Sequence, residues 1–230
     1  MSENIHLVFS TPPAEIGDEQ YNQWYDAHLG EILVVPGFSA ARRYGLQPVN
    51  GTATPTEFRF LSMYEIEGDI PEIMEALRKE GTSGNMQLPE WFRGISFASW
   101  NCVQLGNSHG KDVVMPDHPY LVFSTPPPEL SFDDYSEWYG VHLEENVANS
   151  PLLRRGWRFR LEPAGPSPDA YRDGPAHLAM YELEGDVEDM RSGLHKKIEA
   201  GGIVLPDWFA GIRFASLDAK ALGGRVAKQG

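Results

Sequence analysis

The sequence predicts an α+β fold made of two similar units, and three observations lead to this prediction. The stretch from Leu7 to Pro13 recurs unchanged from Leu121 to Pro127. The order of β-rich and helix-type segments is the same in both halves of the chain. Each half, at about 110 residues, has the size of an ordinary domain. Any chemistry carried by one unit is therefore expected to have a counterpart in the other.

The first unit reads strand, helix, strand, strand, helix, strand. Pro12 and Pro13 end the first strand because proline cannot continue a strand ladder. Asp18 is expected to cap the first helix, and Pro36-Gly37 closes it. The expected elements are a strand at 5–10, a helix at 19–35, strands at 38–46 and 58–66 around a polar loop at 50–55, a helix at 70–79 capped by Asp69, and a strand at 95–105.

The second unit repeats this order after a joint rich in glycine, asparagine and serine. Its expected elements are strands at 121–124, 153–161, 177–183 and 212–217, and helices at 133–147 and 187–200. The predicted boundaries are a first repeat at 1–105, a linker at 106–118, a second repeat at 119–222 and a flexible tail at 223–230.

A β-α-β-β-α-β order implies a four-stranded antiparallel sheet with both helices on one face, the ferredoxin-like arrangement. Apolar side chains fall on both faces of the expected strands, with Phe60 and Tyr64 on one side and Leu61 and Met63 on the other. The face without helices therefore needs a cover. The simplest cover is the matching face of the other unit.

The order of elements, the spacing of Tyr21, Trp24, Tyr25, His28 and Leu29, and the run from Val35 to Tyr44 resemble the dimeric α+β barrel superfamily, in particular its EthD-like branch. The resemblance covers residues 5–105 and 119–217. It implies two ferredoxin-like units packed sheet to sheet, as a fused form of that dimer, with small ligands between a sheet and its own helices. Its members include isomerases, cyclases, monooxygenases and haem proteins.

Composition restricts the partners and the compartment. The formal net charge of -14 disfavours nucleic acid, because the phosphate backbone repels an acidic protein. Cys102 is the single cysteine, and the first residues lack the pattern of a secretion signal. No apolar run approaches the roughly 20 residues that a membrane span needs. We expect a cytoplasmic protein that binds neither nucleic acid nor membrane.

The first predicted helix of each unit carries the candidate chemistry. Tyr21, Trp24, Tyr25 and His28 are spaced three and four residues apart, so they share the stripe that faces the sheet. Glu31 follows His28 by three residues and can accept a hydrogen bond from its ring. The second unit has Tyr135, Trp138, Tyr139, His142 and Glu145 at the same offsets. A core stripe whose histidine is satisfied by the backbone remains the alternative.

General acid-base catalysis is the functional interpretation of this stripe. A neutral imidazole takes and returns a proton near pH 7, an adjacent carboxylate fixes its tautomer, and a phenol stabilises an oxygen anion. The predicted catalytic residues are His28, Tyr21 and Glu31 in the first unit and His142, Tyr135 and Glu145 in the second. The predicted substrate-binding residues are Trp24, Tyr25, Arg43, Tyr64, Trp138, Tyr139, Arg158 and His177.

The arginines offer a second indication. Arg42 and Arg43 are adjacent in a predicted strand, so one of them points to whichever face is buried. Arg158 corresponds to Arg43 if one residue is inserted in the second unit. An inward arginine can bind a carboxylate or phenolate of a substrate. The structural alternative is a pair with Glu65 or Glu182 across the sheet.

The two units differ where function would show. Phe60 is replaced by His177 and His6 by Tyr120 at corresponding positions. We expect one unit to be active and the other to be remodelled. The first unit is favoured because it is closer to the family pattern, and the second, with His142 and His177, is the rival.

The leading hypothesis is a cofactor-independent lyase or isomerase that acts on a small aromatic or ring-derived metabolite. No nucleotide-binding motif occurs, and His28 with Glu31 lacks the further ligands of a metal site. Haem binding through His28, His142 or His177 is the second hypothesis. A non-catalytic small-ligand-binding protein is the third. The sequence leaves open whether the chain forms a homodimer.

Overall fold

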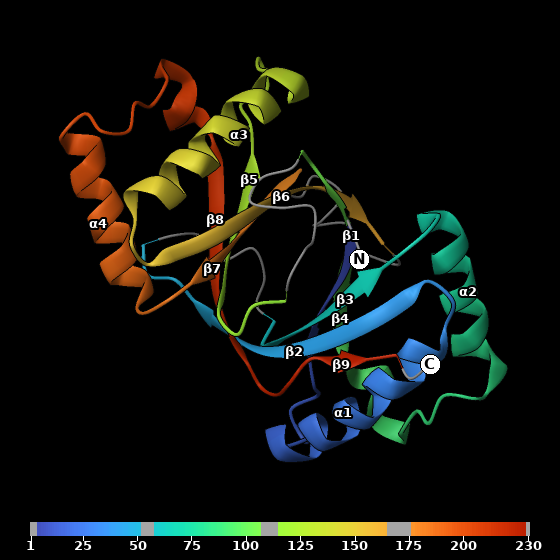
Figure 1. The fold of residues 1–230 in the computed structure, drawn as a ribbon. Coiled ribbons are helices and arrows are strands. Elements are labelled where there is room, and N and C mark those ends of the chain that lie inside the picture. The colour runs from blue at the N-terminus through green and yellow to red at the C-terminus, as the bar shows by residue number, and fades with distance from the viewer. Residues whose placement is uncertain (1–3, 52–57, 107–114, 165–175, 229–230) are drawn as a thin grey trace.

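The chain folds as a closed β-barrel with its helices on the outside (Figure 1). The computed structural model describes residues 4–51, 58–106, 115–164 and 176–228. Most of the loop expected at 50–55 and of the linker expected at 106–118 lies outside these residues.

Within the described residues, eight antiparallel strands form the barrel, and a ninth short strand pairs with one of them. Around the ring the order is β3-β1-β4-β6-β7-β5-β8-β2, and β2 closes on β3. The two halves of the chain meet where β4 pairs with β6 and where β2 pairs with β8. The strands are β1 (Asn4–Thr11), β2 (Phe38–Pro48), β3 (Phe60–Ile66), β4 (Ser96–Gln104), β5 (Pro119–Thr125), β6 (Leu153–Pro163), β7 (His177–Leu183), β8 (Arg213–Ala221) and β9 (Val226–Ala227).

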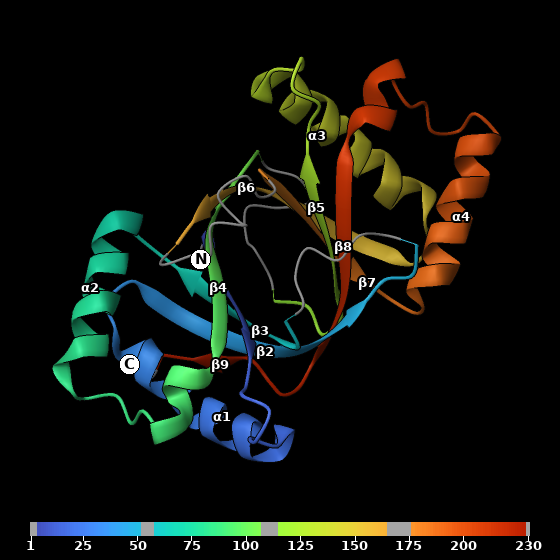
Figure 2. The ribbon, with the colours of Figure 1, turned by 180° about the vertical axis from the view of Figure 1, so that it is seen from behind.

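In the part of the chain that the structure describes, four α-helices cover the barrel in two pairs. They are α1 (Asp18–Val34), α2 (Ile70–Ser83), α3 (Phe132–Asn149) and α4 (Val187–Glu199). Figures 1 and 2 show α1 and α2 on one side of the barrel and α3 and α4 on the opposite side. Each half therefore places its sheet between its own helices and the barrel interior, and the α+β prediction is confirmed.

The strands alternate between two environments because successive side chains point to opposite faces. One face of each strand fills the barrel interior with large apolar groups, including Phe9, Trp100, Phe123 and Trp157. The other face packs under the helices in two separate clusters, one in each half. The barrel interior is thus a packed core, and the space under the helices is where polar and aromatic residues meet.

Helix ends follow local capping rules, with one difference from the prediction. Asp69 caps α2, and its carboxylate accepts a hydrogen bond from the backbone N–H of Glu72 at 3.1 Å, as predicted. The prediction of Asp18 as the cap of α1 was wrong. The capping residue is Gly17, and Asp18 lies in the first turn, where its carboxylate pairs with Arg59. That ion pair draws the Asp18 side chain away from the N–H groups that a cap would bind.

The C-terminal segment differs from the predicted flexible tail at 223–230. Its strand β9 pairs with Ala40 and Ala41 of β2. The guanidinium of Arg225 donates to the buried carboxylate of Glu65 at 2.9 and 2.6 Å. A buried carboxylate needs such a partner, and the sequence showed no signal that the partner would be 160 residues away.

Replacing Arg225 by alanine is expected to lower the free energy of unfolding by about 2 kcal/mol, because it leaves the Glu65 carboxylate buried without its cation. This value is below the range for fully buried pairs, since the Arg225 side chain is 44% exposed. Urea unfolding measures the change. The double variant Glu65→Gln/Arg225→Ala is expected to recover part of the loss. A single variant as stable as the wild type would contradict a role for this pair.

Candidate functional site

The inward stripe of α1 lies against the outer face of the first sheet. Tyr21, Tyr25 and His28 are all buried. Tyr21 and Tyr25 belong to one apolar cluster with Phe60 and Tyr64 of β3, and the His28 ring lies beside Trp24 and Tyr25. The predicted stripe therefore exists, and its aromatic rings contact one another closely. Tyr21 lies 5.5 Å from Tyr25 and 5.2 Å from Phe60 between ring centroids.

His28 belongs to a clamp that ties α1 to the segment after α2. Its Nδ1 lies 2.8 Å from Glu31 Oε2, so Glu31 orients the ring as the spacing predicted. The other Glu31 oxygen accepts the backbone N–H of Gln87 at 2.9 Å, and the Trp24 indole donates to the Gln87 carbonyl at 3.0 Å. Trp24 stacks on the His28 ring at 4.8 Å. Burial lowers the pKa of His28, and the Glu31 carboxylate opposes this shift.

The counterpart helix α3 repeats the stack but not the hydrogen bond. Trp138 lies 4.7 Å from His142, again nearly parallel. The distance from His142 Nδ1 to Glu145 Oε2 is 3.9 Å, too long for a hydrogen bond, and this nitrogen is buried without a partner among the described residues. Burial lowers the pKa of His142 to about 4. The pairing of histidine and glutamate thus differs between the two halves.

The phenols under the helices are protonated at neutral pH. Burial raises the pKa of Tyr21, Tyr25 and Tyr64 in the first half, and of Tyr135, Tyr139 and Tyr181 in the second. Tyr135 donates to Ser124 Oγ at 2.7 Å, whereas the Tyr21 hydroxyl is buried with no partner among the described residues. Phenols in this state can donate hydrogen bonds but cannot act as bases.

Arg43 points under α1, and its partners differ from the Glu65 pair that was the structural alternative. Its guanidinium donates to Asn22 Oδ1 at 2.7 Å and to Asp26 Oδ1 at 3.1 Å. It also lies 4.5 Å from the centre of the Tyr25 ring. Glu65 pairs with Arg225 instead, and Glu182 pairs with Arg155 at 2.6 Å. The Arg43 side chain is thus held by helix α1 itself.

Arg158 occupies the place of Arg43 in the second half, as the one-residue insertion predicted. Arg43 pairs in register with Ser62, the third residue of β3, and Arg158 with Ala179, the third residue of β7. Arg158 Nη2 donates to Ser136 Oγ at 2.8 Å, and burial lowers its pKa.

His177 lies near Arg158 under α3. Its ring stacks on Phe132 at 4.4 Å and meets the edge of Tyr135 at 4.6 Å. Its Nε2 is buried without a partner among the described residues. Burial, and secondly the charge of Arg158, lower the pKa of His177 to about 4.

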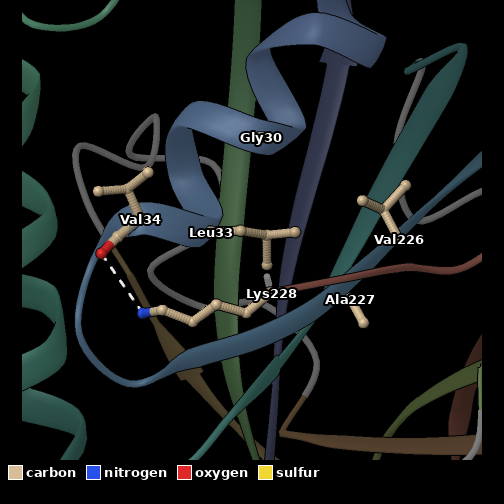
Figure 3. Close-up of a pocket in the computed structure, with 6 residues that line it drawn as sticks. All are labelled: Gly30, Leu33, Val34, Val226, Ala227 and Lys228. Atoms are coloured by element: carbon tan, nitrogen blue, oxygen red, sulfur yellow. Dashed lines mark hydrogen bonds between the residues drawn. The ribbon is translucent and has the colours of Figure 1, made fainter. Parts of the chain in front are cut away.

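Three surface cavities are described, and none of them borders the predicted stripe. One of about 430 Å³ lies between the end of α1 and β9, where Lys228 Nζ donates to the carbonyls of Val34 and Val35 (Figure 3). This lysine closes the C-terminal end of α1, where carbonyl groups lack helical partners. A second cavity, of about 450 Å³, lies on the exposed segment from Leu88 to Arg93. Neither of these two contains a buried titratable group.

The remaining cavity has about 490 Å³ and lies between α2 and the outer face of the first sheet. His6 and Ser99 line it from β1 and β4, and Ala164 closes it from the other half of the chain. The wall on α2 is formed by Pro71, Met74, Glu75, Leu77 and Arg78. It is mainly apolar, with a charged pair at one side, and this composition suits a small organic molecule.

His6 is the buried titratable group of this pocket. Its Nδ1 lies 2.8 Å from Asn101 Oδ1, so Nδ1 carries the proton and Nε2 carries the lone pair. The ring is fixed by Phe38, edge-on at 6.1 Å, and by Tyr64 at 6.2 Å. Burial lowers the pKa of His6 to about 4, which the Asn101 bond only partly offsets. His6 is therefore neutral and oriented at pH 7.

A charged pair stands at the α2 side of the pocket. Arg78 donates from Nε and Nη2 to the two oxygens of Glu75, each at 2.8 Å. This bidentate bond lowers the pKa of Glu75 to about 2. Arg78 is the cationic side chain among the described residues of the lining.

The same place in the second half is filled by larger side chains. Tyr120 replaces His6 and donates to Ser216 Oγ at 3.2 Å. Val49, at the end of β2, is buried in the second-half cluster, whereas Ala164 stands at the corresponding end of β6. The carbonyl next to it, at Asn50, accepts a hydrogen bond from Arg191 of α4 at 2.5 Å. The larger side chains of Tyr120 and Val49 thus leave less room at this place than His6 and Ala164 do in the first half.

Comparison with known proteins identifies the fold. Neither a protein-family profile nor a curated protein sequence matches this chain. Chlorite dismutase from Candidatus Nitrospira defluvii, in complex with imidazole, is similar in structure, with a TM-score of 0.54, 9% identity, and coverage of 96% of this chain and 92% of that chain. A mutant of chlorite dismutase from the same organism gives a TM-score of 0.55 at 9% identity, covering 97% and 93%. The chain has an α+β barrel fold.

A protein from Fusobacterium nucleatum, provisionally named a monooxygenase, is similar to this barrel over 99% of the present chain and 95% of its own, with a TM-score of 0.50 and 10% identity. At identities this low, similarity shows a common fold and leaves the activity open. Among the described residues of the barrel, no three histidine, cysteine, aspartate or glutamate side chains cluster as metal ligands. None of its described helices is long and apolar enough to cross a membrane.

Proposed function

We propose that this α+β barrel is a cofactor-independent enzyme of the lyase or isomerase type, in which His6 moves a proton of a small ring-containing metabolite. The observation that carries the proposal is a neutral imidazole, fixed by Asn101, on the wall of the pocket under α2. The prediction from the sequence was that His28, in the same half, is the base. His6 is preferred because it lines a described cavity.

His6 has the properties of a general base. The Asn101 amide holds Nδ1–H, so Nε2 is the nitrogen that takes the proton. The low pKa keeps this nitrogen unprotonated throughout the physiological range and also makes it a weaker base than an ordinary imidazole. A correctly placed acid or base contributes about 10²–10⁴-fold to a rate. The guanidinium of Arg78 is the group that would stabilise an oxygen anion formed on the substrate.

The side chains that line the pocket under α2 indicate the class of substrate. Pro71, Met74, Leu77 and Ala164 present apolar surface, and the volume of about 490 Å³ suits a molecule of one or two rings. A carbon acid next to a carbonyl group, on a ring-derived skeleton, combines an abstractable proton with an oxygen that Arg78 can meet. The first half is the active one in this proposal, because the second half has the larger Tyr120 and Val49 at the places of His6 and Ala164.

We further propose that the chain is a fusion of two ferredoxin-like units of the EthD-like branch. Support comes from the repeated sequence stretches and from the same order of strands and helices in both halves. A cytoplasmic location and association into homodimers belong to the same proposal.

Haem binding is the alternative that the fold suggests, and it has one observation in its favour. His142 Nδ1 and His177 Nε2 are buried nitrogens without a partner among the described residues. The surroundings do not fit the group, however. Trp138 stacks on one ring and Phe132 on the other, and none of the three described cavities borders either histidine. A Soret band after titration with haemin would restore this alternative.

A variant that fills the pocket tests the proposed site. Ala164→Leu is expected to weaken binding of a small-ring ketone by at least about tenfold, because the added carbons occupy the space of the ligand. A panel of such ketones is first screened by thermal shift, and hydrogen-deuterium exchange at the acidic carbon in D₂O is then followed by NMR. Ala164→Ser, which adds one atom, is the control. Equal binding to all three proteins would place the site elsewhere. Binding without exchange would support a non-catalytic ligand-binding protein instead.

A further inference from the structure

The two buried arginines under α1 and α3 have different counter-charges. Arg43 is 2% exposed and meets the Asp26 carboxylate at 3.1 Å. Asp26 stands five residues after Tyr21 on α1, and the residue five positions after Tyr135 on α3 is Gly140. The Asp26 carboxylate neutralises the guanidinium of Arg43, and the corresponding residue of the second half is a glycine, which has no side chain to do the same for Arg158.

The two guanidinium groups make corresponding hydrogen bonds to Asn22 of α1 and to Ser136 of α3. Arg43 Nη1 donates to two acceptors, the Asn22 carbonyl and Asp26 Oδ1. Arg158 Nη1 donates to one, the carbonyl of Ser136, which stands where Asn22 stands. The second N–H of Arg158 Nη1 has no acceptor among the described residues. This unused donor corresponds to the one that binds the carboxylate in the first half.

Arg158 also has no carboxylate partner among the described residues, although only 7% of it is exposed. The ionisable groups around it are the phenols of Tyr139, Tyr135 and Tyr181 and the imidazole of His177, all of which are neutral at pH 7. A buried cation without a counter-charge is strongly unfavourable, and water satisfies its hydrogen bonds without neutralising it. An anion does both.

No side chain at position 140 covers the edge of the Arg158 guanidinium, because this residue is glycine. A Cβ atom placed there would make a tight contact of 3.3 Å with Arg158 Nη1, and the atoms that it meets within 4 Å all belong to Arg158. In the first half the Asp26 side chain is 67% exposed while it holds Arg43, so this position is reached from solvent. The edge of the second guanidinium is thus open at the rim of α3.

We propose that Arg158, at the gap left by Gly140, binds the carboxylate group of a small organic acid in the position that the Asp26 side chain occupies in the first half. Arginine suits this ligand because its planar N–H groups match the two oxygens of a carboxylate. The site lies in the opposite half of the chain from His6 and is independent of the proposed acid-base function.

Thermal unfolding in sodium formate and in sodium chloride at equal ionic strength tests the proposal. Above the dissociation constant, each tenfold rise in formate is expected to raise the Tm of the wild type by about 3–5 °C, because the ligand binds the folded state alone. Chloride is expected to give a smaller rise, since it cannot bond to two N–H groups at once.

Two substitutions at one position provide the matched controls. Gly140→Asp supplies an internal carboxylate and is expected to raise the Tm in chloride and to abolish the additional effect of formate. Gly140→Ala improves helix propensity, but its methyl group enters the gap at 3.3 Å from Arg158 Nη1, so it is expected to weaken the formate response. Asp26→Gly is expected to create a second formate-responsive site at Arg43.

Equal Tm values of the wild type in formate and chloride would overturn the proposal. A formate response that persists unchanged in Gly140→Asp would also overturn it, because the anion would then act elsewhere. If Gly140→Asp does not fold, Gly140→Ala and Asp26→Gly still decide. An unchanged formate response in Asp26→Gly would show that a missing carboxylate does not create the site.

Discussion

His6→Asn is expected to slow proton abstraction by about 10²–10⁴-fold and to leave the protein folded. The asparagine amide can donate to Asn101 Oδ1 as His6 Nδ1 does, so the hydrogen bond of 2.8 Å has a replacement. The lone pair of Nε2 has none. Exchange of the acidic substrate proton in D₂O, followed by NMR, measures the rate. Because binding depends mainly on the apolar wall, the dissociation constant is expected to change by less than the rate.

The controls separate His6 from the histidine on the helix stripe. His28→Gln removes the imidazole that stacks on Trp24, and we expect exchange within a few-fold of the wild type. Tyr120→Phe alters the corresponding position of the second half and is expected to have no effect on exchange. Loss of exchange in His28→Gln, with normal exchange in His6→Asn, would transfer the catalytic role to the helix stripe.

Acidification from pH 6.5 towards pH 4 is expected to destabilise the protein steeply. Burial lowers the pKa of His6, His142 and His177 to about 4 in the folded state, while the unfolded chain protonates them near 6.5. Between these values the unfolded state binds more protons, so stability falls as the pH falls. Each histidine contributes up to about 3 kcal/mol of this loss. Urea unfolding at half-unit pH intervals measures the slope.

A substitution that copies the corresponding residue of the first half tests which histidine causes the pH dependence of stability. His177→Phe places at β7 the residue that stands at the corresponding Phe60 of β3, where it packs 5.2 Å from Tyr21. The variant is expected to keep its stability at pH 7.5 and to lose about 1.4 kcal/mol per pH unit from the slope between pH 6 and 4.5. A slope identical to that of the wild type would show that His177 is not among the titrating groups.

The order of elements could be predicted because it depends on local signals. Strand periodicity, the Pro12-Pro13 break and the Asp69 cap each act within a few residues, and the structure has them as predicted. The cap of α1 could not be predicted, because Asp18 binds Arg59, 41 residues further along the chain. Strand β9 could not be predicted either, since two residues carry no periodicity.

The candidate site was predictable only in part. The helix stripe with Tyr21 and His28 follows from a period of 3.6, and the structure shows the stripe facing the sheet. His6 has no local signal. It is one histidine in a strand, its partner Asn101 is 95 residues away, and the pocket depends on Ala164 from the other half. The single indication was the difference between His6 and Tyr120 in otherwise similar strands.

Ala164 and Val49 have a consequence for how the two halves evolve. Each residue ends a strand of its own half and covers the outer sheet of the other, because β6 pairs with β4 and β2 pairs with β8. The shape of the pocket under α2 therefore depends partly on residues of the second half. A substitution at the end of β6 alters what the first half can admit, so natural selection on one half restricts sequence drift in the other, and the two halves cannot diverge independently.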